Sequence, residues 1–440
     1  MSELEAIHER PVELLRSLIR FDTTNPPGNE GSCIRYVEEV LRAAGVESEL
    51  HARDPDRPNL VARLRGDGTA PPLLLYGHVD VVPTAGQQWS RPPFDGELAD
   101  GFVWGRGALD MKSGVTMLIS AFLRAKTEGL PLRGDLVLAV LSDEEAGGDY
   151  GARFLVEEHP ELFSGVRWAL GEFGGFNTHV AGRRVYVIQV AEKQMCWLRG
   201  VLRGRGGHAA VPSRGTTMGT LGELLTRLDR RQPPIHVTPV PRAMVEALAR
   251  VLPRPKAVVL RRVLDPRLAD RVLPVLGRRF AALGAGLRNT ASVTIVRCGD
   301  KINVIPSEVE LEIDGRLLPG FTPDDLIGEL HDLVGDALEL EVVRHDPGPP
   351  EPDLTHFETL ADILRELDPD AIPVPLLQPG VTDARFFARL GIQTYGFLPM
   401  RLPKDLVLNE LLHAADERIP VEAVEFGAEG VYRAVRRLAA

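Results

Sequence analysis

Cysteine and long apolar runs are both scarce in this chain of 440 residues. Its three cysteines, Cys33, Cys196 and Cys298, lie far apart and form no Cys-x-x-Cys pair, so the sequence supports neither a disulfide framework nor a thiolate zinc site. We expect reduced, buried thiols in a cytoplasmic protein. No stretch approaches the roughly 18 apolar residues of a membrane-spanning helix, and the N-terminus lacks the apolar core of a signal peptide.

Basic residues are fewer than acidic residues in this chain. The chain has 51 Lys and Arg residues against 62 Asp and Glu residues, a formal net charge of −11. This balance argues against a nucleic acid or an anionic membrane as partner, because either would favour a basic face. The hydrophobic fraction of 44% and the charged fraction of 26% are ordinary for a soluble globular enzyme. The length predicts two or three domains.

Residues 1–183 alternate helical patterns with short apolar runs, as in an α/β domain with a mostly parallel sheet. An amphipathic helix is expected near the N-terminus, where Leu14, Leu15, Leu18 and Ile19 have helical spacing. We expect strands at 72–77, 136–141 and 166–170, and helices at 34–44 and 111–126.

Residues 184–348 show a different order of elements: strand, helix, strand, strand, helix, strand. The expected strands are 196–203, 293–298, 309–316 and 338–344, and the expected helices are 216–230 and 324–334. This order predicts a small α+β domain of the split βαβ type. About 50 extra residues, 233–289, interrupt it and are expected to form a structural helical insertion. The Pro-rich stretch 347–352 predicts a stiff linker, and the α/β pattern resumes in 349–440. The small domain is therefore inserted into the larger one.

Acidic and histidine residues follow the apolar strands of the larger domain. His78 and Asp80 follow the first strand, Glu144 and Glu145 follow the second, and Glu172 follows the third. Sites in open α/β sheets form beyond the carboxyl ends of the strands, so these side chains can converge. Each signal also has a purely structural explanation, such as a His–Asp pair or a solvated acidic turn.

Two further motifs add candidate ligands. Asp110 lies in the glycine-rich stretch GRGALDMKSG, although a helix cap explains it equally well. His413 lies in LLHAADERI, where an exposed histidine at a helix start is the alternative. Two histidines and several carboxylates without cysteine suit Zn²⁺, Co²⁺ or Mn²⁺ in a hydrolytic pair. Since the sequence has no G-x-S-x-G motif and no recognisable cysteine nucleophile, we expect water activated by the cations to be the nucleophile.

Taken in order, GHVD, GRGALDMKSG, SDEEAGG, GEFGG and HAADER resemble the motifs of the M20 family of metallopeptidases. That family includes glutamate carboxypeptidases, aminoacylases, acetylornithine deacetylase and succinyl-diaminopimelate desuccinylase. The resemblance extends over nearly the whole chain. It implies an α/β, zinc-peptidase-like catalytic domain (1–183 and 349–440) and an inserted ferredoxin-like lid or dimerisation domain (184–348). It also implies two divalent metal ions, zinc first and cobalt or manganese as alternatives, and a homodimer formed through the lid.

The resemblance assigns roles to single residues. Asp110 would bridge both ions, with His78 and Glu172 completing one site and Glu145 and His413 the other. Glu144 would be the general base and Asp80 would orient His78, and a cis peptide is expected between Asp110 and Met111. In the lid, His208 would stabilise the oxyanion in the partner subunit's active site. The substrate-contacting residues implied by the resemblance are Asn303, Arg316, Gly380, Thr382 and Asp383, with Arg316 holding a carboxylate.

The resulting hypothesis is a hydrolase that cleaves the amide bond of a small N-acyl amino acid or of a short peptide with a free carboxylate. A dipeptidase or aminopeptidase that recognises a free amine is the first alternative. A catalytically silent binding protein on the same fold is the second. The long segment between His208 and Asn303 resembles the aminoacylase and carboxypeptidase-S branch, which leaves the mode of dimerisation open.

Overall fold

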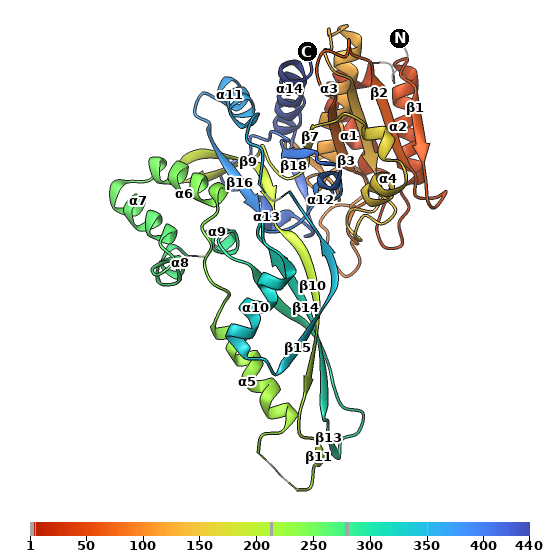
Figure 1. Cartoon of the computed structure of the whole chain (residues 1–440). Helices are drawn as coiled ribbons and strands as arrows, with labels where there is room; N and C mark the ends of the chain where they lie inside the picture. Colours follow the sequence, from red (N-terminus) through yellow and green to blue (C-terminus); the bar gives the residue numbers. More distant parts are fainter. Residues whose placement is uncertain (1–3, 5, 212–213, 278–280, 350) are drawn as a thin grey trace. The chain divides into compact units, whose positions relative to one another are not determined.

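Figure 1 shows a computed structural model of the chain, which describes residues 4, 6–211, 214–277, 281–349 and 351–440. The chain forms two compact units. The first unit contains Met1–Val190, Asp353–Leu376 and Thr382–Ala440. The second unit contains Ala191–Pro352 and Leu377–Val381.

The first unit is built on a nine-stranded sheet with the order β1-β2-β6-β3-β7-β17-β9-β16, to which β8 adds by pairing with β9. The strands are β1 Ser48–His51, β2 Asn59–Leu64, β3 Leu73–His78, β6 Leu136–Leu141, β7 Trp168–Gly171, β8 Asn177–Val180, β9 Arg183–Glu192, β16 Ile372–Gln378 and β17 Gln393–Gly396.

The expected parallel arrangement is correct for the centre of this sheet and wrong for its flanks. Strands β6, β3, β7 and β17 are parallel to their neighbours in this series, whereas β2 and β9 run antiparallel to theirs. The antiparallel pairs β2–β6 and β9–β17 join strands that are far apart in the sequence, whereas β8 and β9 form a hairpin. Ala181 and Gly182, both with positive φ, make the two-residue turn between β8 and β9.

Apolar side chains explain the central strands. Every residue of β3 and of β6 is buried, as expected for parallel strands that are covered on both faces. On one face, Leu74 and Tyr76 pack with Phe386 and Phe387 of α12 (Ala384–Phe387) and with α4 (Ala152–Glu158). The helix α3 (Lys112–Thr127) contacts β3 and β6, and it packs against α1 (Pro11–Ile19) and α14 (Val421–Leu438).

The helices of the first unit agree with the sequence pattern. The apolar face of α1, formed by Leu14, Leu15, Leu18 and Ile19, is buried as predicted. The remaining elements of this unit are α2 Gly31–Ala43, β4 Glu97–Ala99, β5 Phe102–Trp104, α11 Phe357–Leu367, α13 Leu408–Leu411, β18 Arg418–Pro420 and the short 3-10 turns η1 Ile7–Glu9, η2 Pro160–Phe163 and η5 Ala388–Leu390.

The second unit is an antiparallel four-stranded sheet with two helices on one face. The sheet order is β12-β14-β10-β15, which is the order of a ferredoxin-like fold. The strands are β10 Gln194–Arg203, β12 Thr290–Arg297, β14 Glu308–Leu317 and β15 Leu338–Asp346, and the helices are α5 Thr217–Arg230 and α10 Pro323–Val334. Leu198 of β10, Leu311 of β14 and Leu330 of α10 share one buried core. The ribbon β11 (Gly207–His208) and β13 (Val304–Ile305) extends beyond one end of this sheet.

The expected insertion is helical. It holds α6 Pro239–Val251, α7 Arg254–Arg261, η3 Arg262–Leu264, α8 Ala269–Leu276 and α9 Ala281–Ala285. The buried Lys193 ties this segment to the sheet, because its Nζ donates to the Ala285 carbonyl at 3.2 Å and to Thr290 Oγ1 at 2.8 Å.

Three details differ from the expectations. The first unit continues to Val190 rather than 183, because β9 is one continuous strand that pairs with β8 and β17. The segment Leu377–Val381 joins the second unit, where the Gln378 carbonyl accepts a hydrogen bond from the Lys193 amide at 2.9 Å. Cys298 is exposed rather than buried, because it lies beyond the end of β12. Pro350, in the expected linker, lies outside the described residues.

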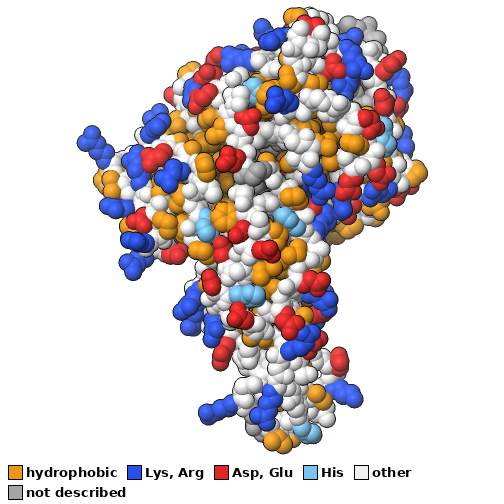
Figure 2. Space-filling view, in the orientation of Figure 1, with side chains coloured by type: hydrophobic (Ala, Val, Ile, Leu, Met, Phe, Trp, Pro, Cys, Tyr) orange, Lys and Arg blue, Asp and Glu red, His pale blue; other side chains and the backbone are white. Residues whose placement is uncertain are grey.

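The surface mixes both signs of charge. On the face drawn in Figure 2, acidic and basic side chains are interspersed over the described residues. No helix in the described part of the chain is long and apolar enough to cross a membrane.

Candidate metal centre

His78 is the last residue of β3, and oxygen atoms of Asp80 contact Nδ1 of its imidazole. The side chain is 1% exposed, and Nδ1 lies 3.0 Å from the Asp80 carbonyl oxygen and 3.3 Å from Asp80 Oδ1. Donation from Nδ1 to these oxygens fixes the tautomer and leaves Nε2 as a lone-pair nitrogen. Among the described residues, this buried Nε2 has no hydrogen-bond partner. It is therefore free to bind a cation.

The first group of ligand atoms surrounds His78 Nε2. Asp110, in the loop before α3, places Oδ1 at 3.4 Å, and Glu172, directly after β7, places Oε2 at 3.2 Å. The three ligand atoms of this group lie within 4.8 Å of one another.

The second group shares Asp110. His413 Nε2 lies 3.2 Å from Asp110 Oδ2 and 3.4 Å from Glu145 Oε2, and these ligand atoms again lie within 4.8 Å of one another. The Asp110 carboxylate therefore turns one oxygen to each group. The loop that carries His413 follows α13, and the histidine has a positive φ of 60°.

The electrostatics of the two groups fit a pair of divalent cations. Burial, reinforced by the charge of Asp110, raises the pKa of Glu145 to about 7. Burial also opposes ionisation of Asp110, but hydrogen bonds from His413 and His78 lower the pKa of that carboxyl. Buried carboxylates at this density need compensating positive charge. Imidazole nitrogens and carboxylate oxygens without thiolates are the donors of hydrolytic zinc, cobalt or manganese sites.

Glu144 lies beside these groups but belongs to neither. Its backbone amide donates to Asp80 Oδ1 at 3.0 Å, and the amide of Glu145 donates to Asp80 Oδ2 at 3.0 Å. Burial, followed by the negative charge of Glu172, raises the pKa of Glu144 well above its ordinary value. The arrangement provides a partly buried carboxyl group, 13% exposed, that can exchange a proton next to the ligand cluster.

Two residues that were not predicted from the sequence, Glu417 and Arg106, stabilise the loop that carries Asp110. Glu417 Oε1 accepts from the amides of Leu109 at 2.7 Å and Asp110 at 3.1 Å, and Glu417 Oε2 accepts from Arg106 Nη1 at 2.5 Å. Both new residues lie inside motifs already noted, GRGALD and HAADER, so only their pairing was hidden. The expected cis peptide between Asp110 and Met111 is confirmed.

The loop residues Thr382 and Asp383 are buried in the first unit. Among the described residues, neither carboxylate oxygen of Asp383 has a hydrogen-bond partner. Burial, together with the charge of Glu172, raises the pKa of Asp383 to about 8 although Arg385 opposes the effect. Arg385, also missed from the sequence, places Nη1 at 3.0 Å from the Thr382 carbonyl and 4.0 Å from Glu144 Oε1. Gly380 belongs to the second unit.

The other predicted lid residues occupy two separate places in the second unit. His208 pairs with Val304 in the β11–β13 ribbon, and the Ala209 amide donates to the Asn303 carbonyl at 3.1 Å, so His208 and Asn303 are neighbours. Arg316 lies near the far end of β14, where its guanidinium pairs with Asp314 through Nε–Oδ1 at 2.8 Å and Nη2–Oδ2 at 3.2 Å. Its Nη1 is buried without a hydrogen-bond partner among the described residues.

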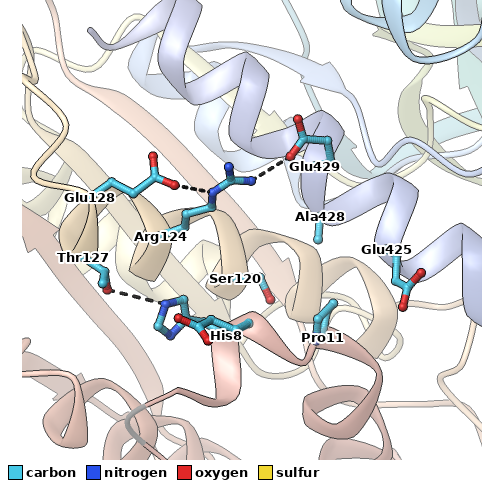
Figure 3. A pocket seen from close by; sticks show the side chains of 10 residues that line it. His8, Pro11, Ser120, Arg124, Thr127, Glu128, Glu425, Ala428 and Glu429 are labelled. Atoms are coloured by element: carbon cyan, nitrogen blue, oxygen red, sulfur yellow. Dashed lines mark hydrogen bonds and ion pairs between the residues drawn. The ribbon is translucent and has the colours of Figure 1, made fainter.

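A groove elsewhere in the first unit shares no residue with the ligand cluster. Figure 3 shows it between η1, α3 and α14. Arg124 crosses the groove, pairing with Glu128 and with Glu429 at 2.7 Å each, and so ties α3 to α14. Its lining is His8, Glu9, Pro11, Ser120, Arg124, Thr127, Glu128, Glu425, Ala428 and Glu429. We assign it a structural role.

Known proteins share both the sequence pattern and the fold. Residues 74–437 match Peptidase family M20/M25/M40. The human N-fatty-acyl-amino acid synthase/hydrolase PM20D1 is 27% identical, over 91% of this chain and 81% of the relative. The succinyl-diaminopimelate desuccinylase of Paracoccus denitrificans is 27% identical over 97% of each chain.

Among solved structures, the M20 family metallo-carboxypeptidase Sso-CP2 from Sulfolobus solfataricus covers 99% of each chain, with a TM-score of 0.66 and 15% identity. This likeness concerns the fold. The family match spans most of the chain, and the resemblance drawn from the five motifs is confirmed. The chain belongs to peptidase family M20/M25/M40 and is a metal-dependent hydrolase of the metallopeptidase and amidohydrolase type.

Proposed function

We propose that this protein is a dinuclear amidohydrolase that cleaves the amide bond of a small N-acyl amino acid or of a short peptide with a free carboxylate. The observation that carries the proposal is the Asp110 carboxylate, which faces His78 with one oxygen and His413 with the other. A carboxylate shared between two groups of ligand atoms is what a pair of neighbouring cations requires.

In this proposal Asp110 would contribute to both sites, His78 and Glu172 would complete one of them, and Glu145 and His413 would complete the other. Zinc is the first choice of metal, with cobalt and manganese as alternatives. When bound, the ions polarise the substrate carbonyl and make water more acidic.

Glu144 is the general base. It accepts a proton from the attacking water at a side-chain oxygen and passes it to the departing amine. Its partly buried position beside both groups, outside either one, supports this role. Asp80 fixes the base in place, since its Oδ1 accepts from the Glu144 amide while its carboxylate and carbonyl oxygens face His78 Nδ1.

Arg316 is proposed to bind the substrate carboxylate. Two of its nitrogens are occupied by Asp314, and the buried Nη1 is the one that remains for an anion. Charge-assisted bonds from guanidinium suit carboxylates. Asn303, Gly380, Thr382 and Asp383 are proposed as further substrate-side residues. The human relative is an N-fatty-acyl-amino acid synthase/hydrolase and the Paracoccus relative a succinyl-diaminopimelate desuccinylase, which supports an N-acylated substrate.

His208 is proposed to stabilise the oxyanion in the active site of a second copy. Arg316 and Glu308 lie at opposite ends of β14, and eight strand residues span about 27 Å. His208 and Asn303 lie beyond the Glu308 end. A small substrate cannot reach both Arg316 and His208 of one chain, which supports a homodimer in which the two come from different copies.

The test combines metal analysis with a substrate panel. The purified protein should contain two divalent ions per chain, lose amide hydrolysis when a chelator removes them, and regain it with zinc or cobalt. N-acyl amino acids should be hydrolysed, and the matching methyl esters, which lack the carboxylate, should react far more slowly. Unchanged turnover after complete metal removal would rule out the proposal.

A dipeptidase or aminopeptidase activity is the second candidate, and Asp383 favours it. This buried carboxyl group without a hydrogen-bond partner among the described residues could receive a free substrate amine. Dipeptides should then be cleaved faster than their N-acetylated forms. The reverse preference, which we expect, assigns the enzyme to N-acyl substrates.

A further inference from the structure

The segment before α2 enters the metal centre through Asn25, a residue that lies in none of the motifs discussed above. Asn25 is 3% exposed. Its backbone is fixed alongside the chain that leaves β3, because the Asn25 amide donates to the Val81 carbonyl at 2.9 Å and the Val81 amide donates to Thr23 at 3.1 Å. The side chain therefore has a defined position next to the residues that follow His78.

The amide nitrogen of Asn25 joins two buried carboxylates. Asn25 Nδ2 lies 2.9 Å from Asp80 Oδ2 and 3.0 Å from Asp143 Oδ1. A carboxamide NH₂ group has two hydrogens, so it can donate one to each acid. The opposite orientation of the amide would point its oxygen at two anions, which settles the assignment of nitrogen and oxygen.

Both acids hold the turn that carries the proposed base and a proposed ligand. Asp80 accepts from the backbone amides of Glu144 and Glu145 at 3.0 Å each. Asp143 directly precedes them, has a positive φ of 70°, and accepts from the Tyr150 amide at 3.0 Å. Asn25 thus connects the partner of His78 to the start of this turn.

The charges around Asn25 explain why a neutral donor stands there. Arg57 already neutralises the region of Asp143, because its Nη2 lies 2.7 Å from Asp143 Oδ1 and 2.7 Å from Glu30 Oε1, with both acids buried. A positively charged side chain in place of Asn25 would compete with the His78 imidazole for the Asp80 carboxylate. A negatively charged side chain there would be repelled by Asp80 and Asp143. An amide supplies hydrogen bonds without either effect.

We infer that Asn25 is a positioning residue of the metal centre, which sets the Asp80 carboxylate and, through it, both the His78 ring and the Glu144–Glu145 turn. The inference rests on the proposed function, because it concerns the same ions. Hydrogen-bond partners directly behind metal ligands, the place of Asp80 here, typically contribute about 10- to 100-fold to metal affinity or activity, and Asn25 acts through that partner. Asn25 should act on metal affinity and kcat and leave the KM for substrate nearly unchanged.

The experiment compares Asn25→Asp, which removes both donated hydrogens and adds a negative charge, with Asn25→Ser, which is neutral and keeps one donor. The matched control is Asn177→Asp. Asn177 is also a buried asparagine of the first unit, and its side chain bonds to the Leu402 backbone, with Nδ2 donating to the carbonyl at 3.1 Å and Oδ1 accepting from the amide at 2.6 Å. Each full-length protein is stripped of metal and titrated with cobalt, with the visible spectrum, the melting temperature, kcat and KM as readouts.

Because Asn25 acts through Asp80, we expect cobalt affinity to fall about 10-fold in Asn25→Asp, at the low end for partners of metal ligands, and less in Asn25→Ser, with a parallel loss of kcat. Asn177→Asp should lower the melting temperature and leave the cobalt titration unchanged. If the Asn25 variants lose thermal stability only, with wild-type cobalt affinity and kcat, the positioning role is wrong. If Asn25→Asp does not fold, Asn25→Ser decides between these outcomes. A wild-type chain that binds no cobalt would instead overturn the proposed function.

Discussion

Two adjacent glutamates, Glu144 and Glu145, have different positions relative to the two groups of ligand atoms and therefore different proposed roles. Glu145 contributes a ligand atom to the group around His413, whereas Glu144 belongs to no group. Both amides bind the same Asp80 carboxylate. The division between the proposed base and the proposed ligand therefore depends on the direction in which each side chain leaves a turn that a single carboxylate holds.

Glu144→Gln tests the base directly. The substitution keeps the volume of the side chain and removes its ability to take a proton, so kcat should fall at least about 10²-fold while metal content stays at the wild-type level. Steady-state kinetics and metal analysis measure the two effects. Glu157→Gln, which removes surface ion pairs of α4 with Arg153 and Arg389, should leave both unchanged. Normal turnover by Glu144→Gln would disprove the assignment.

Asp110 should behave differently from every other ligand. Because its two oxygens face different groups, Asp110→Ala should lower the occupancy of both ions. Glu172→Ala and His413→Ala each remove a ligand from one group only and should weaken one ion. Metal content per chain, measured after dialysis against a fixed free zinc concentration, separates these patterns. An Asp110→Ala protein with two bound ions would contradict the bridge.

At the scale of elements, the junction between the helical insertion and the sheet of the second unit has an unusual feature. Lys193 is 1% exposed, and its ammonium bonds the carbonyl that ends α9 and the first residue of β12. Burial, with a further contribution from Arg316, lowers the pKa of Lys193 from 10.5 to about 7. The insertion is thus anchored through a group that loses its charge near neutral pH.

This lysine should make stability depend on pH. Between pH 7 and 10.5 the unfolded chain binds the Lys193 proton and the folded chain does not, so the free energy of unfolding rises with pH, by at most about 1.4 kcal/mol per pH unit. Below pH 7 the full cost of the buried charge remains. Lys193→Met does not bury a charge and should therefore be more stable than wild type at pH 7. Because the wild-type free energy of unfolding rises with pH, this difference should shrink from pH 7 to 9.

Urea unfolding at pH 6, 7, 8 and 9 measures the difference between the two proteins. The exposed Lys126→Met is the control and should follow the wild-type pH dependence. A constant difference between wild type and Lys193→Met over this range would show that Lys193 does not lose its proton there.

The elements that the sequence revealed are those with a strong local signal. Leu136–Leu141 is β6 with the predicted bounds, because a continuous apolar run admits few other structures. Three of the proposed ligands have a related signal: His78 ends β3, and Glu145 and Glu172 follow β6 and β7, so sheet geometry brings them together. Asp110 and His413 lie in loops next to helices and were proposed from their motifs. The hairpin β8–β9 was missed, because β8 is short and mostly polar and its turn to β9 depends on positive φ at Ala181 and Gly182.

The pairings of the residues that hold the proposed ligands in place could not be predicted from the sequence. Asn25 and Asp143 are 118 positions apart, and Arg106 and Glu417 are 311 apart. Nothing in either stretch alone indicates its partner, since the pairing arises only when the sheet is assembled. The motifs therefore predict the ligands, and tertiary structure is needed to find what holds them.

For the whole molecule, the proposed sharing of active sites between copies makes a sharp prediction. His208→Ala and Glu144→Gln should each be nearly inactive alone. Mixed after reversible dissociation, they should form dimers with one site that has both wild-type residues, which restores up to about a quarter of wild-type activity for a two-fold symmetric pair. Activity assays of the mixture, with size-exclusion chromatography to verify dimers, measure it. No recovery in mixed dimers would place His208 in the site of its own chain.

The order of the proposed ligands along the chain also has a consequence for synthesis. Four of the five precede Val190, the entire second unit follows them, and His413 comes only after that unit. A nascent chain can therefore gather His78, Asp110 and Glu172 before the second unit is made, whereas the group that needs His413 stays open until that unit has been synthesised. On the proposed function, the site around His78 would be completed first and the site around His413 second.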